Sequence, residues 1–342
     1  MDIIRKNTLM LLKSALFGAP PSIDKLSEGE WETIYDYSKD QSVTALCFES
    51  ITKLPEELRP SRSLYFHWAM FSEQTEIKYR EKKQRLAKFL QLIGDNPKVL
   101  IIKGFSLARN YPVPSHRWCG DVDIFCFEQS ENVDRIMEAS GIEVDYSNPR
   151  HSMFRIDGLK FENHRYFLYN RKESEEKEFE LFLQREAEGC CHQSDSQIVL
   201  GTPMGNAVFF LKHTEEDFVF SRQNIKLRAL CDWTTLLNAG EVDYSELKKQ
   251  IKGTSLERFA DTLITVSVKY LGLSPDFLKN FEPIPQKIVD DFLFMALNYQ
   301  NQVELRGTLK GKMDRLLKYL RHYNTYKYLF DRNIIRWYYF SK

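Results

Sequence analysis

The chain has 342 residues, of which 43% are hydrophobic, 13% aromatic and 28% charged. These fractions are typical of a globular protein with a sizeable core, and they exclude a disordered or fibrous chain. The 48 Lys and Arg residues balance the 48 Asp and Glu residues, so no overall charge indicates a polyanionic partner.

We expect neither a membrane-spanning segment nor an export signal. No stretch reaches the ~20 apolar residues that a spanning helix needs. Residues 8–18 are interrupted by Lys13 and lack a small-x-small cleavage site, so they predict an amphipathic first helix. The six cysteines form neither a disulfide framework nor a CxxC pair. We therefore expect a cytoplasmic protein.

The first 95 residues have a helical pattern. Between Ser63 and Gly94 there is no proline or internal glycine, and apolar residues recur at helical spacing. Gly94 to Pro97 then predicts the end of this helix.

The middle of the chain changes to short apolar, β-branched runs that predict strands. Asp157-Gly158 separates two of these runs by two residues, which predicts a hairpin. Residues 130–140 and the acidic segment 173–188 predict helices. The predicted strands are 99–102, 122–127, 142–146, 151–156, 159–169 and 197–200.

From Thr202-Pro203 onward the helical period returns. We therefore predict an α+β fold, in which a small mixed-sheet core is flanked by N-terminal and C-terminal helical segments. The expected regions are an N-terminal helical region (1–95), an α/β core (96–201) and a C-terminal helical domain (202–342).

The most distinctive motif is Gly120-Asp121-Val122-Asp123. On a strand, Asp121 and Asp123 share a face while Val122 points into the core. Two adjacent carboxylates repel unless a cation lies between them, and a divalent metal ion supplies one. The alternative interpretation is a solvated strand end, but here the pair opens an otherwise apolar strand.

Two further motifs carry candidate residues. At Lys103-Gly104 a strand breaks into a short helix, and amides at a helix start beside a lysine suit a phosphate group. On the second hairpin arm, Glu162 and His164 share a face, and Glu162 could reach the metal as a third carboxylate. An exposed edge-strand Glu162 explains the pattern equally well. His151 and Arg155 also share a strand face and could approach a nucleotide or simply face solvent.

Taken in order, these motifs resemble an uncharacterised bacterial nucleotidyltransferase family within the polymerase-beta-like nucleotidyltransferase superfamily. The matching features are Lys103-Gly104, the Arg-x-x-Gly-Asp-x-Asp stretch from Arg117 to Asp123, and Glu162 with His164. Residues 227–232 are similar to a downstream Arg-x-x-x-Asp helix of that family. The resemblance covers roughly residues 60 to 240.

The resemblance implies an enzyme that moves a nucleotidyl group from an NTP, ATP foremost, to a hydroxyl of an unknown acceptor. Asp121, Asp123 and Glu162 would be catalytic and would hold Mg²⁺ (or Mn²⁺). The implied nucleotide-binding residues are Lys103, Gly104, Ser106, Arg117 and His164. The chain departs from the superfamily pattern at Phe105, where a small residue usually follows the glycine.

Other functions remain open on the sequence alone. One is a nucleotidyltransferase fold that binds or pairs with a partner without turnover. Another is an Asp-x-Asp glycosyltransferase, which predicts a larger, mostly parallel sheet ahead of Asp121.

The C-terminal segment 306–342 holds ten basic residues against two acidic ones, interleaved with aromatic residues. This pattern suits nucleic acid or a membrane surface. We favour instead a helix whose aromatic residues pack on the preceding domain.

Overall fold

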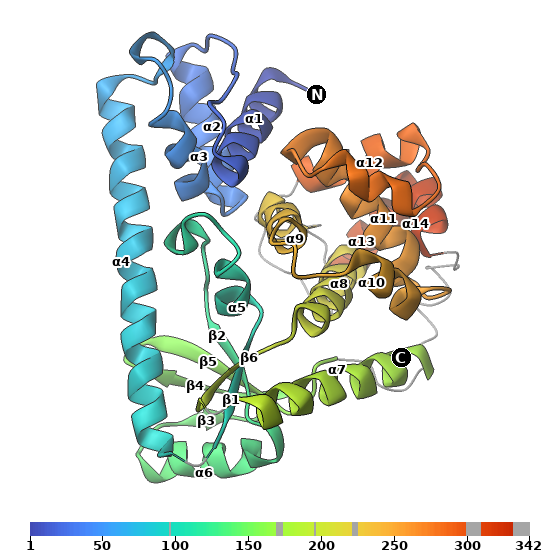
Figure 1. Ribbon diagram of the computed structural model, residues 1–342. Coiled ribbons are helices and arrows are strands. Elements are labelled where there is room, and N and C mark those ends of the chain that lie inside the picture. Colours follow the sequence, from blue (N-terminus) through green and yellow to red (C-terminus); the bar gives the residue numbers. More distant parts are fainter. Residues whose placement is uncertain (96, 169–173, 195, 221–224, 299–308, 331–342) are drawn as a thin grey trace. The chain divides into compact units, whose positions relative to one another are not determined.

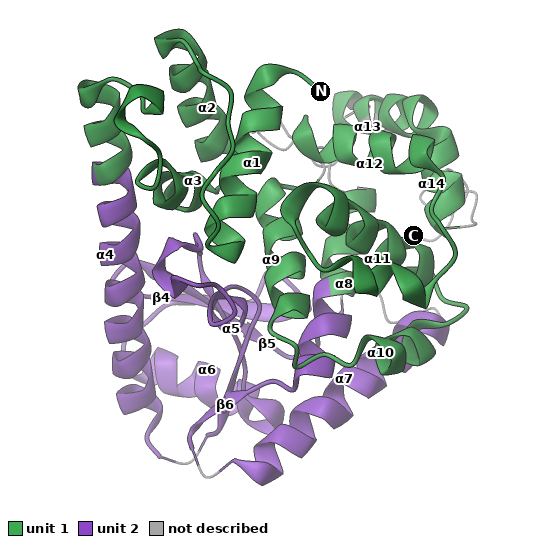
Figure 2. Cartoon of the chain, turned by 45° about the horizontal axis from the view of Figure 1, so that its top comes forward, with its two compact units in different colours: residues 1–69, 211–342 green, residues 70–210 purple. Residues whose placement is uncertain are grey.

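The computed structural model describes residues 1–95, 97–168, 174–194, 196–220, 225–298 and 309–330 (Figure 1). The chain divides into two compact units, shown in different colours in Figure 2. Unit 1 contains residues 1–69 and 211–342, and unit 2 contains residues 70–210. The predicted α+β class is confirmed, because a mixed sheet is preceded and followed in the chain by helical segments.

Unit 1 is helical throughout its described part. The predicted first helix is present as α1, capped by the Asp2 side chain at its start and by left-handed Gly18 at its end. Both long helices that join the units, α4 (Arg62–Ile93) and α8 (Pro203–Phe220), are shared between them. The other elements are α1 (Ile3–Phe17), α2 (Glu28–Asp40), α3 (Thr44–Ile51), η1 (Glu56–Leu58), α9 (Leu227–Asn238), α10 (Tyr244–Ile251), α11 (Leu256–Val266), η4 (Ser267–Leu271), η5 (Pro275–Asn280), α12 (Gln286–Leu297), α13 (Leu309–Arg321) and α14 (Tyr323–Phe330).

The described part of the basic C-terminal segment forms α13 and α14. Tyr319 and Tyr326 are buried there, and the Tyr326 ring lies 5.3 Å from that of Phe218. Tyr323 is about half exposed. Trp337, Tyr338 and Tyr339, and the basic residues beyond position 330, lie outside the described residues. Two of the aromatic side chains therefore pack inside unit 1, as the favoured interpretation expects.

Unit 2 contains a six-stranded mixed sheet in the order β3-β4-β5-β2-β1-β6. Strand β2 lies centrally, antiparallel to β1 and parallel to β5, while β6 is parallel to β1. The strands are β1 (Val99–Ile102), β2 (Val122–Phe125), β3 (Val144–Asp145), β4 (His151–Ile156), β5 (Leu159–His164) and β6 (Ile198–Leu200). The remaining elements are α5 (Gly104–Ala108), η2 (Pro114–His116), η3 (Phe127–Gln129), α6 (Ser130–Ala139) and α7 (Ser174–Gln193).

The hairpin predicted at Asp157-Gly158 is confirmed. Strands β4 and β5 are antiparallel neighbours, with Ile156 opposite Leu159. Asp157 and Gly158 have positive φ angles of 46° and 79°. This conformation matches a two-residue turn whose twist suits the flanking strands, and glycine adopts it most easily. The turn fixes which residues of β4 and β5 face each other.

One face of the sheet forms the core of unit 2. Helices α4 and α6 lie beside this face in Figure 1, and their apolar residues pack against it. Phe89 of α4 stacks on Phe154 and Phe161, with ring centroids 5.9 and 5.2 Å apart. Because side chains alternate along a strand, the residues between these core positions project from the opposite face. That opposite face carries the candidate site.

None of the helices in the described ranges combines the length and apolar character that crossing a membrane requires. All six cysteines lie in the described ranges, and all are free thiols.

Candidate functional site

The parallel pairing of β2 with β5 places two acidic residues side by side. Asp123 is opposite Glu162 in this register, and both project away from the apolar core. The Asp123 side chain is 4% exposed and that of Glu162 is 12% exposed. Asp121 comes directly before β2, and its side chain is 35% exposed. The three carboxylates thus run from a buried position to the surface.

Two lysines connect these carboxylates. Lys103, at the end of β1, places its Nζ 2.7 Å from Asp123 Oδ1 and 4.0 Å from Glu162 Oε2. Lys160, on β5, places its Nζ 2.9 Å from Asp121 Oδ2 and 2.7 Å from Glu162 Oε1. Each ammonium group therefore lies between two carboxylates, and Glu162 belongs to both pairs.

Two histidines complete the cluster. His164 is fully buried, and its Nε2 lies 3.0 Å from Asp123 Oδ1 and 3.6 Å from Glu162 Oε2. The hairpin register places His151 of β4 opposite His164. The Nδ1 atom of His151 lies 3.8 Å from Glu162 Oε2. Strands β2, β4 and β5 thus contribute to one polar cluster.

The cluster holds its carboxylates in the charged form. Burial opposes ionisation of Asp123, but Lys103 and His164 outweigh it and hold the pKa of Asp123 well below its ordinary value. Burial likewise opposes ionisation of Glu162, yet His164, Lys103 and Lys160 lower its pKa to about 2. For His151, burial is the largest cause of a pKa lowered to about 4. Near neutral pH the site therefore combines ionised carboxylates with a neutral His151.

The backbone of the turn after β1 is strained at Lys103, whose amine lies between Asp123 and Glu162. Lys103 has φ 54° and ψ −125°, a conformation that side-chain-bearing residues rarely adopt. Its carbonyl accepts a hydrogen bond of 2.9 Å from Leu107 N, so α5 begins immediately after the strand. This turn directs the Lys103 side chain back to Asp123.

Gly104 allows a close approach of the loop before β2. A Cβ at this position would lie 3.1 Å from Arg117 Nη1 and 3.3 Å from Cys119 Sγ. Arg117 is buried and donates from Nη1 to the carbonyl of Trp118 and to Cys119 Sγ. Lys82 Nζ donates to the carbonyl of Cys119 and helps to fix the same loop. Gly104 therefore admits the loop that leads to Asp121.

A known family matches most of the chain. The family described as "Uncharacterised nucleotidyltransferase" matches residues 27–272. The chain belongs to this nucleotidyltransferase family. Searches of curated proteins and of solved structures found no match. The family's description supports a general nucleotidyl-transfer activity, and its matched range contains the whole polar cluster.

The structure brings five of the predicted residues of this family member together: Asp121, Asp123, Glu162, Lys103 and His164. Gly104 and Arg117 pack against each other in the turn. Ser106 is buried on α5, with its hydroxyl 3.5 Å from Asn206 Oδ1 on α8. The predicted phosphate-binding roles of Gly104, Ser106 and Arg117 remain predictions.

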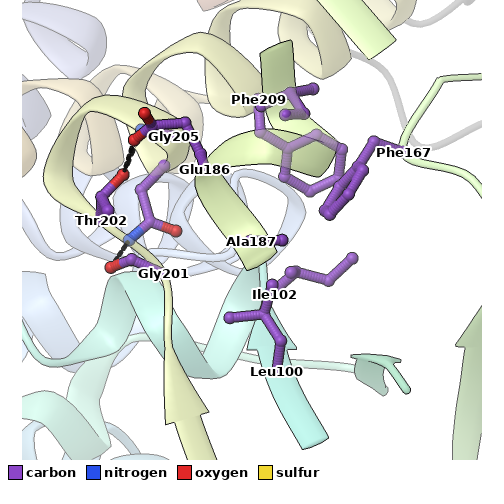
Figure 3. Close-up of a pocket in the computed structure, with 11 residues that line it drawn as sticks. Leu100, Ile102, Phe167, Glu186, Ala187, Gly201, Thr202, Gly205 and Phe209 are labelled. Atoms are coloured by element: carbon purple, nitrogen blue, oxygen red, sulfur yellow. Dashed lines mark hydrogen bonds between the residues drawn. The ribbon is translucent and has the colours of Figure 1, made fainter. Parts of the chain in front are cut away.

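An apolar cavity lies on the same sheet face as the carboxylates. Ile102 lines it, and Ile102 is the register partner of Asp123. The cavity measures about 290 Å³ including the solvent at its mouth. Figure 3 shows Phe167 and Phe209 on one side and the Gly201-Thr202 segment on the other. Asn206, the neighbour of Ser106, also lines it, so Ser106 is placed near this cavity.

Sequence reasoning missed Lys160 and gave His151 no firm role. The signal for Lys160 was the alternation of side chains along a strand. Lys160 and Glu162 are two residues apart on β5, so they share a face. For His151, the signal was the Asp157-Gly158 turn, because this turn sets the register that pairs His151 with His164.

The glycosyltransferase alternative expected a larger, mostly parallel sheet ahead of Asp121. Among the residues described before that position, only β1 is a strand, and it is antiparallel to β2. The sheet therefore does not have the arrangement that this alternative requires.

Proposed function

We propose that this protein transfers a nucleotidyl group from an NTP, with ATP as the first candidate, to a hydroxyl group of an acceptor. The observation that carries the proposal is the in-register pairing of Asp123 with Glu162 on parallel strands, with Asp121 beside them. Within a nucleotidyltransferase family, such a carboxylate cluster is suited to a metal-bound triphosphate.

The donor set fits Mg²⁺ (or Mn²⁺). Carboxylate oxygens of Asp121 and Glu162 lie within 3 Å of one ammonium nitrogen, and an oxygen of Asp123 lies 2.7 Å from another. These oxygens already surround positive charge, and hard divalent cations prefer oxygen ligands. Asp121, Asp123 and Glu162 would hold the metal. When bound, it would neutralise charge on the triphosphate and stabilise the charge that develops during transfer.

The lysines have a second use in this proposal. Lys103 and Lys160 carry flexible side chains with point charges, and a triphosphate offers them additional anionic partners. We expect both ammonium groups to turn from the carboxylates to phosphate oxygens when the nucleotide binds. The lysines would then orient the triphosphate while the carboxylates are released to the metal.

The proton of the acceptor hydroxyl needs a separate acceptor. A carboxylate with a pKa of about 2, as at Glu162, is a weak general base near neutral pH. We therefore assign Glu162 to ligand binding, and solvent water is the acceptor of the proton in this proposal.

The first test is calorimetric titration of Mg²⁺ and ATP into the wild type and into the Asp121→Ala/Asp123→Ala variant. We expect at least about tenfold weaker binding in the variant, because two oxygen ligands are lost. Asp145→Ala is the matched control, since Asp145 is an exposed aspartate of the same sheet. Equal binding in the wild type and the double variant, or no binding in either, would contradict the proposal.

Turnover distinguishes the enzyme from a binding protein that has lost activity. Incubation with radiolabelled NTP and a pool of cellular acceptors should release pyrophosphate in the wild type. Nucleotide binding without pyrophosphate release in any acceptor pool would favour the binding protein.

A further inference from the structure

The polar cluster contains a second kind of cation site beside the carboxylates. We propose that His151, Glu162 and His164 bind a divalent transition-metal ion of the Zn²⁺ type. The site shares Glu162 with the proposed nucleotide site, but its existence does not depend on nucleotidyl transfer.

The three ligand atoms are already close to the required spacing. One ligand atom from each of His151, Glu162 and His164 lies within 4.8 Å of the other two. The Nδ1–Oε2 distance is 3.8 Å and the Nε2–Oε2 distance is 3.6 Å. Tetrahedral ligands about 2.1 Å from Zn²⁺ are roughly 3.4 Å apart. The two nitrogen–oxygen distances are therefore within about 0.4 Å of this spacing, and the two histidine nitrogens would approach each other by up to about 1.4 Å.

His151 supplies an independent observation. The residue is only 8% exposed, and its Nδ1 is buried without a hydrogen-bond partner among the described residues. Buried polar atoms nearly always have a partner, because leaving one unpaired is unfavourable. This nitrogen lies on the side of His151 that faces Glu162, so a metal ion there would satisfy it.

His164 is positioned to offer its other nitrogen. Its Nδ1 lies 3.4 Å from the carbonyl oxygen of Tyr166. A metal ion at Nε2 would take the place of the proton that Nε2 donates to the ionised Asp123, while the Tyr166 carbonyl can accept from Nδ1. Because Nε2 lies 3.0 Å from Asp123 Oδ1, Asp123 is the adjacent oxygen for a fourth position.

The two oxygens of Glu162 face different partners. Oε1 contacts Lys160, which also contacts Asp121, whereas Oε2 faces both histidines and lies 4.0 Å from Lys103 Nζ, which would turn away when a metal ion binds. One carboxylate can therefore serve two cations. Imidazole ligands favour zinc and neighbouring transition metals, and oxygen-only positions favour Mg²⁺. The Oε2 side is thus suited to a transition metal and the Oε1 side to magnesium.

The test uses Co²⁺ as a visible probe of the zinc-type site in the full chain. We expect Co²⁺ to give ligand-field absorption bands that Zn²⁺ removes by competition. In His151→Ala, Co²⁺ should bind at least about tenfold more weakly, because one of three protein ligands is lost. His151→Asn, which keeps a polar side chain, is the second variant, and circular dichroism checks that both fold.

The control is Cys191→Ser/His192→Ala, which removes the adjacent thiol and an exposed histidine of α7. Co²⁺ affinity should be unchanged there. The inference is overturned if the wild type gives no such bands, or if both folded His151 variants keep the wild-type affinity. It is also overturned if the control variant alone loses the bands.

The outcome is separable from that of the nucleotide proposal. Asp121→Ala should weaken binding of ATP with Mg²⁺ while leaving Co²⁺ affinity within about twofold, since Asp121 lies on the Oε1 side. If the wild type binds Co²⁺ in a way that depends on His151 but binds no nucleotide, the histidine site stands and the nucleotide proposal fails. If nucleotide binds while Co²⁺ does not, the reverse holds.

Discussion

The two faces of the central sheet are built from the same strands but stabilised in different ways. On one face, Phe154 and Phe161 pack with Phe89 in a continuous apolar core. On the other face, Glu162 and Asp123 are held by lysines and histidines. The first face gains free energy by removing apolar surface from water, whereas the second spends part of that gain on buried charge.

This difference indicates which face is functional. Buried ion pairs contribute little net stability, because the desolvation of both charges offsets their attraction. A strained Lys103 adds a further unfavourable contribution on the same face. Features that a fold does not need for its stability are concentrated at sites that bind or react. The comparison predicts different responses to substitution on the two faces.

The largest expected effect is on the apolar face. Phe161 is fully buried and stacks on both Phe89 and Phe154. Phe161→Ala should lower the free energy of unfolding by about 3 to 5 kcal/mol, because it removes buried surface and leaves a cavity. Urea denaturation measures this loss.

The neighbouring residue provides the control for this prediction. Glu162→Gln, one position along β5 but on the polar face, should weaken binding of Mg²⁺ and ATP, and its loss of stability near neutral pH should diminish in acid, unlike that of Phe161→Ala. Losses of stability with the same pH dependence in the two variants would remove the distinction between the faces.

Much of the apolar face could be predicted from the sequence, because its signals are local. The run Val99 to Ile102 predicts a buried strand, and Asp157-Gly158 predicts the hairpin and therefore its register. Alternation along β5 then places Glu162 and His164 together. These inferences need only the order of neighbouring residues.

The rest of the site depends on pairing between distant segments. The register that brings Asp123 beside Glu162 joins β2 to β5, with two further strands between them in the chain. No local pattern specifies a parallel register of this kind. The packing of Arg117 against Gly104 likewise follows from the path of the loop before Asp121. Arg117 was expected to bind the nucleotide, and that role remains a prediction.

The second prediction concerns acid. Glu162 has a folded pKa of about 2 against an ordinary value of 4.5. In the unfolded chain it takes up a proton near pH 4.5, so its contribution to stability is present above that pH and is lost as pH falls toward 2. Glu162→Gln should therefore reduce the loss of stability between neutral pH and about pH 3 by about 2 kcal/mol.

Urea midpoints at the two pH values measure this effect. Glu143→Gln is the control, because Glu143 is exposed just before β3 of the same sheet. Phe161→Ala should lower stability by the same amount at both pH values. If Glu162→Gln loses as much stability as the wild type between the two pH values, folding does not lower the pKa of Glu162 and this prediction is wrong.

The smallest expected effect is that of backbone strain at Lys103, measured separately from the effect of its charge. Lys103→Ala and Lys103→Gly both remove the amine beside Asp123, so they differ only in how well the backbone tolerates φ 54° and ψ −125°. Glycine adopts this conformation readily and alanine does not. Lys103→Gly should therefore be more stable than Lys103→Ala by at least about 1 kcal/mol, measured by urea denaturation. At Ala108 in α5, where the backbone is helical, the same comparison should have the opposite sign, because glycine is the poorer residue in a helix. If alanine were the more stable residue at both positions, the turn would not be strained, and the position of the Lys103 amine would follow from its ion pair with Asp123 alone.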